Sequence, residues 1–346
     1  MKAVILLIIV VSLTIQPANA AQLNAPKVPA SGADVMPEKA DSFGEGLWQI
    51  FKAAIGISHP HLREAGDICL RVMVVCLLCG VISNFPGGEK GVSDLVATVA
   101  AGTLLLGSTQ SLLHLGVQTV TQMSEYGKLL LPVMTAAMAA QGGITGSAAL
   151  YAGSAFFSNL LSGMMVSVMV PLMYVYLALS AAGAAVGEDI LKKLRDFIKW
   201  LMVWCLKIIL YVFTGYMGIT GIVSGTTDAA ALKAAKLTIS GVVPVVGGIL
   251  SDASEAVLVS AGLVKNAAGI YGLLALISVC IGPFLKIGIH YLLLKATGAV
   301  SGMFGPKPAV SLIEDFSGAM GLLLAMTGSV CLLLLISTVC FLKGVG

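Results

Sequence analysis

Charged side chains are scarce in this sequence. Only 20 Lys and Arg and 17 Asp and Glu occur among 346 residues, or 11%, whereas a soluble domain carries about 25%. Hydrophobic residues make up 58%, and the mean hydropathy is +0.97. Such a chain cannot cover a water-facing surface, which excludes a soluble enzyme, a nucleic-acid-binding protein and a disordered scaffold. The composition predicts an all-α polytopic integral membrane protein.

Motifs for catalysis, metals and cofactors are also missing. The sequence contains no HExxH, Walker loop, dinucleotide fingerprint or GxSxG elbow, and no predicted span has the central aspartate of an intramembrane aspartyl protease. All seven cysteines lie in segments predicted to span, so no disulfide framework is expected. We therefore predict that the protein is not an enzyme and holds no metal or cofactor.

Residues 1–20 are predicted to be a cleavable signal peptide. One basic residue precedes an apolar run, and Ala18-Asn19-Ala20 then supplies the small residues that a signal peptidase reads, so cleavage falls between Ala20 and Ala21. The alternative is an uncleaved first transmembrane helix. The apolar run of about 13 residues is shorter than the roughly 20 needed to span. Cleavage places the mature N-terminus outside the cytoplasm.

The next two segments differ in composition. Residues 21–45 contain three prolines and mixed charges, which is typical of a flexible extracytoplasmic tether. Residues 46–66 begin with the amphipathic stretch GLWQIFKAAIGI, interpreted as a segment lying on the membrane surface. A helix packed on the rest of the protein is the alternative for this stretch.

Residues 67–346 are predicted to form a membrane domain of about six transmembrane helices, because only a helix satisfies its own backbone in lipid. The predicted spans are roughly 68–85, 92–117, 158–186, 200–224, 267–294 and 318–342. Two further apolar regions, 129–157 and 237–262, are interrupted by prolines and by paired glycines. Each piece is too short to cross alone, so both regions are interpreted as re-entrant or broken-helix hairpins buried in protein or lining a cavity.

Basic residues support an orientation with the N-terminus outside. The predicted cytoplasmic loops 86–91, 187–199 and 295–317 hold seven Lys and Arg residues, and the outer loops 118–128 and 225–240 hold three. This excess agrees with the positive-inside rule. The stretch 188–200 is also predicted to form an interfacial helix on the cytoplasmic face, with acidic residues at its positive N-terminal end.

Four prolines are candidate helix-breaking positions and suggest a parallel internal repeat. Pro132 and Pro244 are 112 residues apart, and so are Pro171 and Pro283. Parallel repeats occur in transporters, with the binding site at the repeat interface. Few other positions match at this offset, so duplication and chance both stay open.

Ionisable residues inside predicted membrane segments are the candidate functional residues. They are Lys207, Lys286 and His290 in spans, and Asp252 and Glu255 in the second hairpin. A charge in lipid costs roughly 2.5–3.5 kcal/mol unless it faces protein, water or a partner. We expect Lys207 and Lys286 to point inward, toward Asp252 or Glu255 or a water-filled path. Snorkelling or a structural ion pair is the alternative.

Three stretches together resemble the stage III sporulation protein AE family. They are LLPVMTAAMAAQGG, the run from VVGGILSDASEAVL through GPFLKIGIHYLLLK, and SLIEDFSGAMGLLLAMTGSVCLLLLISTVCFLKG. The resemblance covers roughly residues 65–346. It implies a membrane component of the transenvelope complex of endospore-forming bacteria, in the mother-cell membrane around the forespore. It also implies ring-forming and other membrane subunits, a secretion-type ATPase and a forespore-side partner.

Two classes of function compete on these observations. In the first, the protein is a non-enzymatic subunit of a channel or secretion-like apparatus that the forespore needs. In the second, it is a self-sufficient secondary transporter with a repeat-interface site for a small anionic solute. A purely structural scaffold is a third interpretation. Genes for a secretion-type ATPase and ring-forming partners beside this gene would favour the first function. Movement of a solute by the purified protein alone in liposomes would favour the second.

Overall fold

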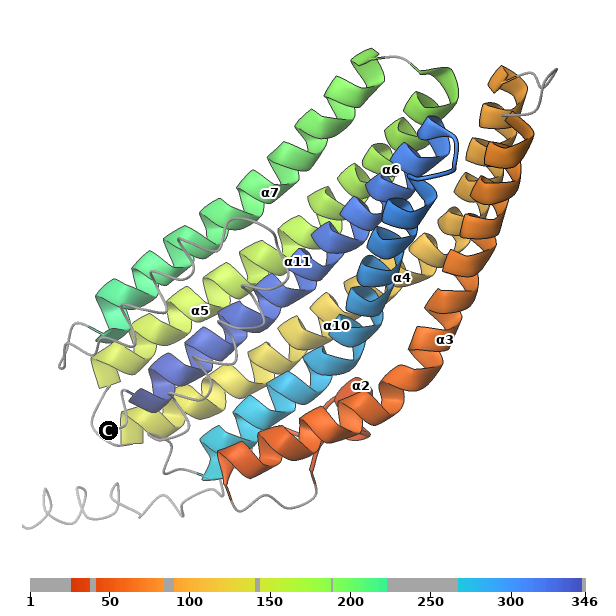
Figure 1. Cartoon of the computed structure of the whole chain (residues 1–346). Helices are drawn as coiled ribbons and strands as arrows, with labels where there is room; N and C mark the ends of the chain where they lie inside the picture. The colour runs from red at the N-terminus through yellow and green to blue at the C-terminus, as the bar shows by residue number, and fades with distance from the viewer. Residues whose placement is uncertain are drawn as a thin grey trace, which may run out of the picture.

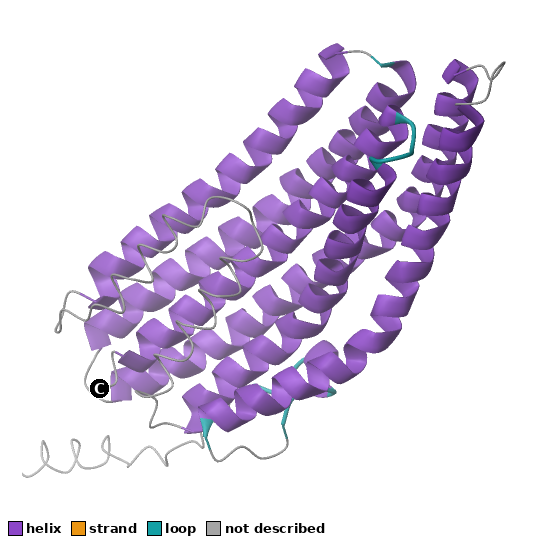
Figure 2. Ribbon diagram, viewed as in Figure 1, coloured by secondary structure: helices purple, strands orange, loops and turns teal. Residues whose placement is uncertain are grey.

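A computed structural model of the chain describes residues 26–37, 42–83, 90–140, 144–187, 189–222 and 267–343. Within these ranges the regular elements are all helices and no strand is present (Figure 2). The helices are α2 (Ala30–Ala33), α3 (Phe43–Ser83), α4 (Lys90–Ala140), α5 (Ile144–Met164), η1 (Met165–Met169), α6 (Val170–Val186), α7 (Asp189–Met217), η2 (Gly218–Ile222), α10 (Ala267–Ser301) and α11 (Lys307–Lys343). Six helical stretches of the described residues are long and apolar enough to cross a membrane. This number confirms the predicted all-α polytopic fold.

The long helices alternate in direction and form one elongated bundle (Figure 1). At one end α3, α6 and α10 finish, and α4, α7 and α11 begin; we call this the inner end, because the predicted cytoplasmic lysines lie there. The other end, where α3, α5 and α10 begin, is the outer end. The pairs α3–α4, α4–α5, α6–α7 and α10–α11 are antiparallel neighbours, and α5, η1 and α6 form one continuous stretch.

Helix α11 forms the centre of the bundle. It packs against α4, α5, α6, α7 and α10, and 83% of its most apolar stretch is buried, compared with 61% for α10 and 28–33% for the other spans. Burial of this kind requires a surface without charge, and α11 carries none between Phe316 and Leu342. The outer helices keep one apolar face for the bundle and leave the other face exposed.

Two glycines are required by the close geometry at the inner end. Gly187 adopts a left-handed φ of 76° after α6 and donates its backbone N–H to the Gly183 carbonyl at 2.9 Å, which ends the helix and turns the chain into α7. Gly80 of α3 lies directly against the backbone carbonyl of Phe304, in the turn between α10 and α11. A Cβ atom at Gly80 would overlap that carbonyl, so only glycine lets α3 approach the turn.

The predicted hairpin over 129–157 and the predicted outer loop over 118–128 are corrected by the structure. Both belong to long helices: α4 continues to Ala140, and Ile144 begins α5. Pro132 lies inside α4 without ending it. A proline removes one backbone hydrogen bond, whereas unwinding the helix in apolar surroundings would leave many groups unsatisfied. The region is therefore the junction of two spans; the second predicted hairpin, 237–262, lies outside the described residues.

The N-terminal segments are also more ordered than predicted. The amphipathic stretch within 46–66 is not a separate element, because α3 runs without a break from Phe43 to Ser83. Part of the predicted flexible tether packs on α10: Gly32 of α2 lies against the Val279 backbone, and Val35 is buried. The predicted interfacial helix over 188–200 is the first part of α7, which continues directly into its span.

Candidate functional site

An ion pair joins α3 to α10 near the middle of both helices. Lys286 Nζ lies 3.0 Å from Glu64 Oε2, and the two side chains are 21% and 50% exposed. His61, one turn before Glu64, places Nδ1 3.9 Å from the same carboxylate oxygen. His290, one turn after Lys286, is buried, and its Nδ1 lies 2.9 Å from the Lys286 backbone carbonyl. We call these four residues the α3–α10 cluster.

Both helices are weakened at the level of this cluster. Pro60 lies inside α3 and Pro283 inside α10, four and three residues from the paired side chains. A proline leaves the carbonyl four residues before it without a helical donor, and this lowers the cost of bending. Ile57 reaches Gly282 across the interface, at 3.9 Å from the position of a Cβ atom there. The Glu64–Lys286 pair therefore connects the two helices where each bends most easily.

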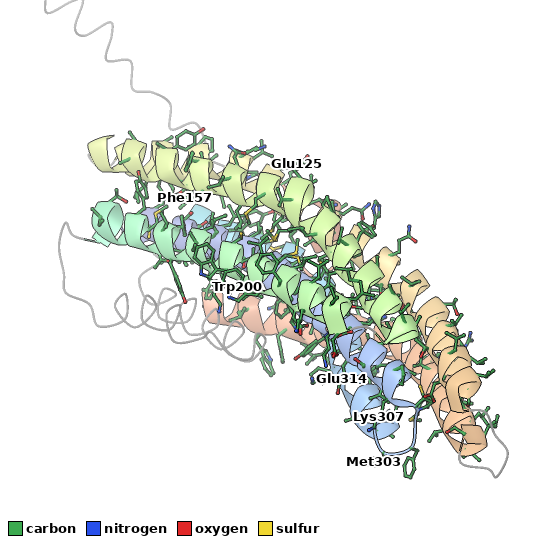
Figure 3. All side chains as sticks on the ribbon, turned by 90° about the horizontal axis from the view of Figure 1, so that it is seen from above. Glu125, Phe157, Trp200, Met303, Lys307 and Glu314 are labelled. Carbon is green, nitrogen blue, oxygen red and sulfur yellow. The ribbon has the colours of Figure 1, made fainter. Side chains whose placement is uncertain are left out.

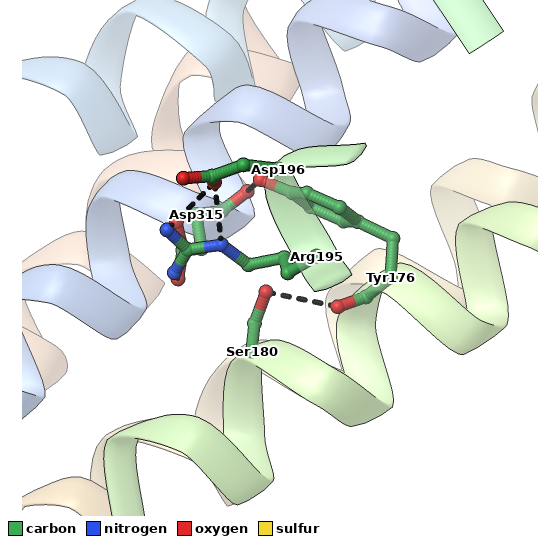
Figure 4. A network of polar contacts seen from close by, with 5 residues as sticks. All are labelled: Tyr176, Ser180, Arg195, Asp196 and Asp315. Carbon is green, nitrogen blue, oxygen red and sulfur yellow. Dashed lines mark hydrogen bonds and ion pairs between the residues drawn. The ribbon is translucent and has the colours of Figure 1, made fainter. Parts of the chain in front are cut away.

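A second ion pair joins α7 to α11 nearer the inner end (Figure 4). The Arg195 guanidinium donates from one terminal nitrogen to Asp315, and from Nε and its other terminal nitrogen to Asp196 Oδ1, at 3.0 and 2.9 Å. Arg195 and Asp315 are only 10% and 12% exposed, whereas Asp196 is 58% exposed. Burial makes the Arg195–Asp315 contact the part of this network that the fold depends on most.

Helix α6 completes this network, which we call the α6–α7–α11 cluster. The Tyr176 hydroxyl donates to the Asp315 backbone carbonyl at 3.2 Å, and Ser180 Oγ donates to the Tyr176 carbonyl at 2.9 Å (Figure 4). Lys199, one turn after Arg195, brings Nζ close to Gly318, where a Cβ atom would lie 3.2 Å from it. Three helices whose contacting residues are up to 139 positions apart in sequence are thus joined by one polar cluster.

The predicted candidate residues are found in different settings. Lys286 and His290 belong to the α3–α10 cluster, whereas Lys207 is half-buried on α7 and forms no ion pair with the described residues. Lys286 does pair with a carboxylate, as expected, but the described partner is Glu64. The expected partners Asp252 and Glu255 lie outside the described residues, as do Pro244, Ala20 and Ala21.

The predicted helix-breaking prolines that the structure describes are accommodated inside helical stretches. Pro132 and Pro283 are internal to α4 and α10. Pro171 is the second residue of α6 and follows the π-helical turn η1. A π turn widens the hydrogen-bond ladder and so makes room for the proline ring. Pro132 and Pro283 therefore do not end their helices, whereas Pro171 lies where the π turn interrupts the α-helical pattern.

Sequence reasoning missed three charged members of the two clusters. The sequence predicts a surface segment around Glu64, indicates only a cytoplasmic charge at Arg195, and gives no role to Asp315. The signal available for Asp315 is its position in IEDF, just before an uncharged run. Nothing in the local sequence points from Glu64 to Lys286, which is 222 residues away.

The charged groups of the two clusters are arranged as ion pairs. Among the described residues, no three His, Cys, Asp or Glu side chains gather closely enough to hold a metal ion. These ion pairs compensate charged side chains where one helix packs against another within the bundle.

Comparison with known proteins extends over both clusters. The family described as stage III sporulation protein AE matches residues 36–344. Stage III sporulation protein AE of Bacillus subtilis (strain 168) is 23% identical over 301 residues, which cover 86% of this chain and 75% of that relative. No solved structure matches the chain. The matched range includes all six membrane-spanning helices.

Proposed function

Because the chain belongs to the stage III sporulation protein AE family, we propose that it is a non-enzymatic membrane subunit of the complex that connects the mother cell to the forespore. Family membership carries the role in sporulation, and the six helices carry the membrane location. The proposed cellular location is the mother-cell membrane around the forespore. The proposed partners are ring-forming and other membrane subunits, a secretion-type ATPase and a forespore-side protein.

The architecture supports a subunit that transmits or withstands movement between helices. Each charged cluster joins helices that are distant in sequence, and the most buried helix, α11, carries one of the joined carboxylates. Such contacts tie the outer helices to the centre of the bundle. They give a subunit a defined shape on which other proteins can assemble.

A deletion strain of the host tests the proposal. Loss of the gene should leave forespores that are engulfed but fail to complete development, and the wild-type gene should restore heat-resistant spores. A tagged protein should copurify with other stage III subunits and localise around the forespore. A normal count of heat-resistant spores in the deletion strain would contradict the proposal.

The alternative function is a self-sufficient secondary transporter, and one observation favours it. The Glu64–Lys286 pair lies near the middle of two spans, and ionisable groups at such positions commonly mark transport pathways. Purified protein in liposomes should then move a small anionic solute without any partner. Liposomes that stay impermeable while the deletion strain fails to sporulate would favour the subunit.

A further inference from the structure

The helices are much longer than a bilayer is thick. α3, α4 and α11 have 41, 51 and 37 residues, and at 1.5 Å per residue α4 is about 76 Å long. The hydrocarbon core of a bilayer is about 30 Å thick. Much of the bundle must lie outside the lipid, or the helices must cross it at a steep tilt.

Contacts between helices define which residues lie at the same level of the bundle. At an inner level, Asp315 of α11 contacts Arg195 of α7, and Leu312, one turn earlier, packs against Gly102 of α4. At an outer level, Ser162 and Phe157 of α5 contact opposite neighbours: Ser162 accepts a hydrogen bond from Ser124 of α4, and Phe157 packs on Phe213 of α7. Helices α4 and α7 can therefore be compared level by level.

The exposed surfaces of α4 and α7 change from apolar to polar in opposite directions. At the inner level the exposed charges are on α7, at Lys192, Lys193 and Asp196, where Ile190 and Leu194 are exposed as well, and α4 exposes Val96, Val99 and Leu106. At the outer level the exposed charges are on α4, at Glu125 and Lys128, whereas α7 exposes Ile208 and Val212, and η2 exposes Ile219. Glu125 lies on the outer edge of the bundle in Figure 3.

A bilayer perpendicular to the bundle axis cannot match this pattern, because either level would bring exposed charges into lipid. We propose that the bilayer crosses the bundle obliquely. The inner half of the α3–α4 hairpin and the outer half of α7 face lipid, and the outer half of α4 stands in water outside the membrane. The steep tilt also fits helices of this length to a bilayer of ordinary thickness.

The exposed charges of helix α3 are distributed as they are on α4. Arg63, Asp67 and Arg71 are exposed toward the outer end, together with apolar residues such as Leu62, whereas the exposed Val74, Leu78 and Ile82 toward the inner end have no exposed charge among them. The change occurs within one helix that shares a side of the bundle with α4, which contacts it along its inner half. The polar surface thus extends over two neighbouring helices.

Aromatic side chains mark the inner boundary of this oblique band on α7. The rings of Phe197, Trp200 and Trp204 stack in a row at 5.9 and 5.8 Å, all half-exposed, next to the exposed lysines. Tryptophan concentrates at the membrane–water interface, so this row lies where α7 passes from water into lipid. Trp48 and Phe51, near the start of α3, stack at 6.1 Å and are also exposed, but they lie far from the inner half of α3 and do not mark the band.

Thiol accessibility tests the proposal on purified protein in phosphatidylethanolamine–phosphatidylglycerol liposomes, where no partner protein is present. Single cysteines are placed at two positions on each level: Val99→Cys and Lys193→Cys, and Glu125→Cys and Val212→Cys. The background carries Ser or Ala at all seven native cysteines; six of these are buried and Cys205 is half-buried, so wild type also serves as a low-labelling control. A hydrophilic maleimide is supplied on both sides of the membrane.

The oblique bilayer predicts that Glu125→Cys and Lys193→Cys react at least tenfold faster than Val212→Cys and Val99→Cys. A perpendicular bilayer predicts that the two cysteines of each level react alike, and that result would overturn the proposal. Failure of Glu125→Cys to react would overturn it as well. Lys128→Cys and Ile208→Cys repeat the outer comparison if either outer variant does not fold.

Discussion

The ion-paired side chains of the two clusters differ in how far they are buried. Arg195 and Asp315 are almost fully covered, at 10% and 12% exposure, whereas Glu64 is half exposed. A charge that loses its partner costs more when protein and lipid cover it than when water reaches it. Loss of one partner should therefore be more damaging in the α6–α7–α11 cluster than in the α3–α10 cluster.

Arg195→Met should lower the free energy of unfolding by about 3–5 kcal/mol, because Asp315 would be left as an uncompensated buried charge. Asp196→Asn is the matched control: Asp196 contacts the same guanidinium but is 58% exposed, so its removal should cost no more than about 1 kcal/mol. Thermal or denaturant unfolding of the purified protein in detergent measures both. Equal effects of the two substitutions would contradict the assignment.

Lys286→Met should destabilise the protein by about 1–3 kcal/mol, because Glu64 loses its charged partner. Adding Glu64→Gln should recover most of that loss, since neither charge then remains uncompensated, and a double-mutant cycle measures the coupling. Lys295→Met is the control: Lys295 is exposed and lies on the opposite face of α10 from Lys286, so its loss should change stability little. Recovery by Asp252→Asn or Glu255→Gln in place of Glu64→Gln would identify the hairpin carboxylates as the partners.

Whole helices are positioned by close backbone contacts as well as by charge. Gly80 brings α3 against the turn between α10 and α11, and Gly187 ends α6 in a left-handed conformation. The two ion pairs lie farther from the inner end than these contacts, so the inner end is constrained by backbone geometry and the middle by side chains. Substitutions at the inner end should consequently act through packing.

Gly80→Ala and Gly107→Ala should have opposite effects on stability. At Gly80 the new methyl group would overlap the Phe304 carbonyl, which must shift at a cost of about 1–3 kcal/mol. No other atom lies within 4 Å of a Cβ atom at Gly107, so alanine there should stabilise the helix by up to about 1 kcal/mol. The melting temperatures of the two variants check the signs; a stable Gly80→Ala variant would show that the turn yields easily.

The orientation of the whole molecule is predicted to follow from export of its N-terminus. If the signal peptide is cleaved between Ala20 and Ala21, Ala20→Tyr should block cleavage, because the peptidase site accepts only small side chains. A slower-migrating precursor should accumulate, and N-terminal sequencing of wild-type protein should begin at Ala21. Wild-type protein that still begins at Met1 would contradict the prediction, and Gln22→Ala, just beyond the site, serves as the control.

The approximate positions of the spans among the described residues could be predicted from apolar run length alone. In lipid a helix is the only chain conformation that satisfies its own backbone, so the length of an uncharged run translates directly into a crossing. The helix boundaries were less predictable. Pro132 and the charged stretch before residue 68 looked like interruptions, but α4 and α3 continue through them, because packing against α10 and α11 offsets a lost hydrogen bond or a polar turn.

The partners of the charged residues depended on the folded arrangement. Lys286 could be singled out as a charge that needs compensation, since its cost in lipid is a property of its own position. The pairing of Lys286 with Glu64 depends on α3 lying against α10, and the pairing of Arg195 with Asp315 depends on α7 lying against α11. Hydrophobic burial is non-directional, so the pattern of apolar residues specifies which faces are covered but not which helix covers them.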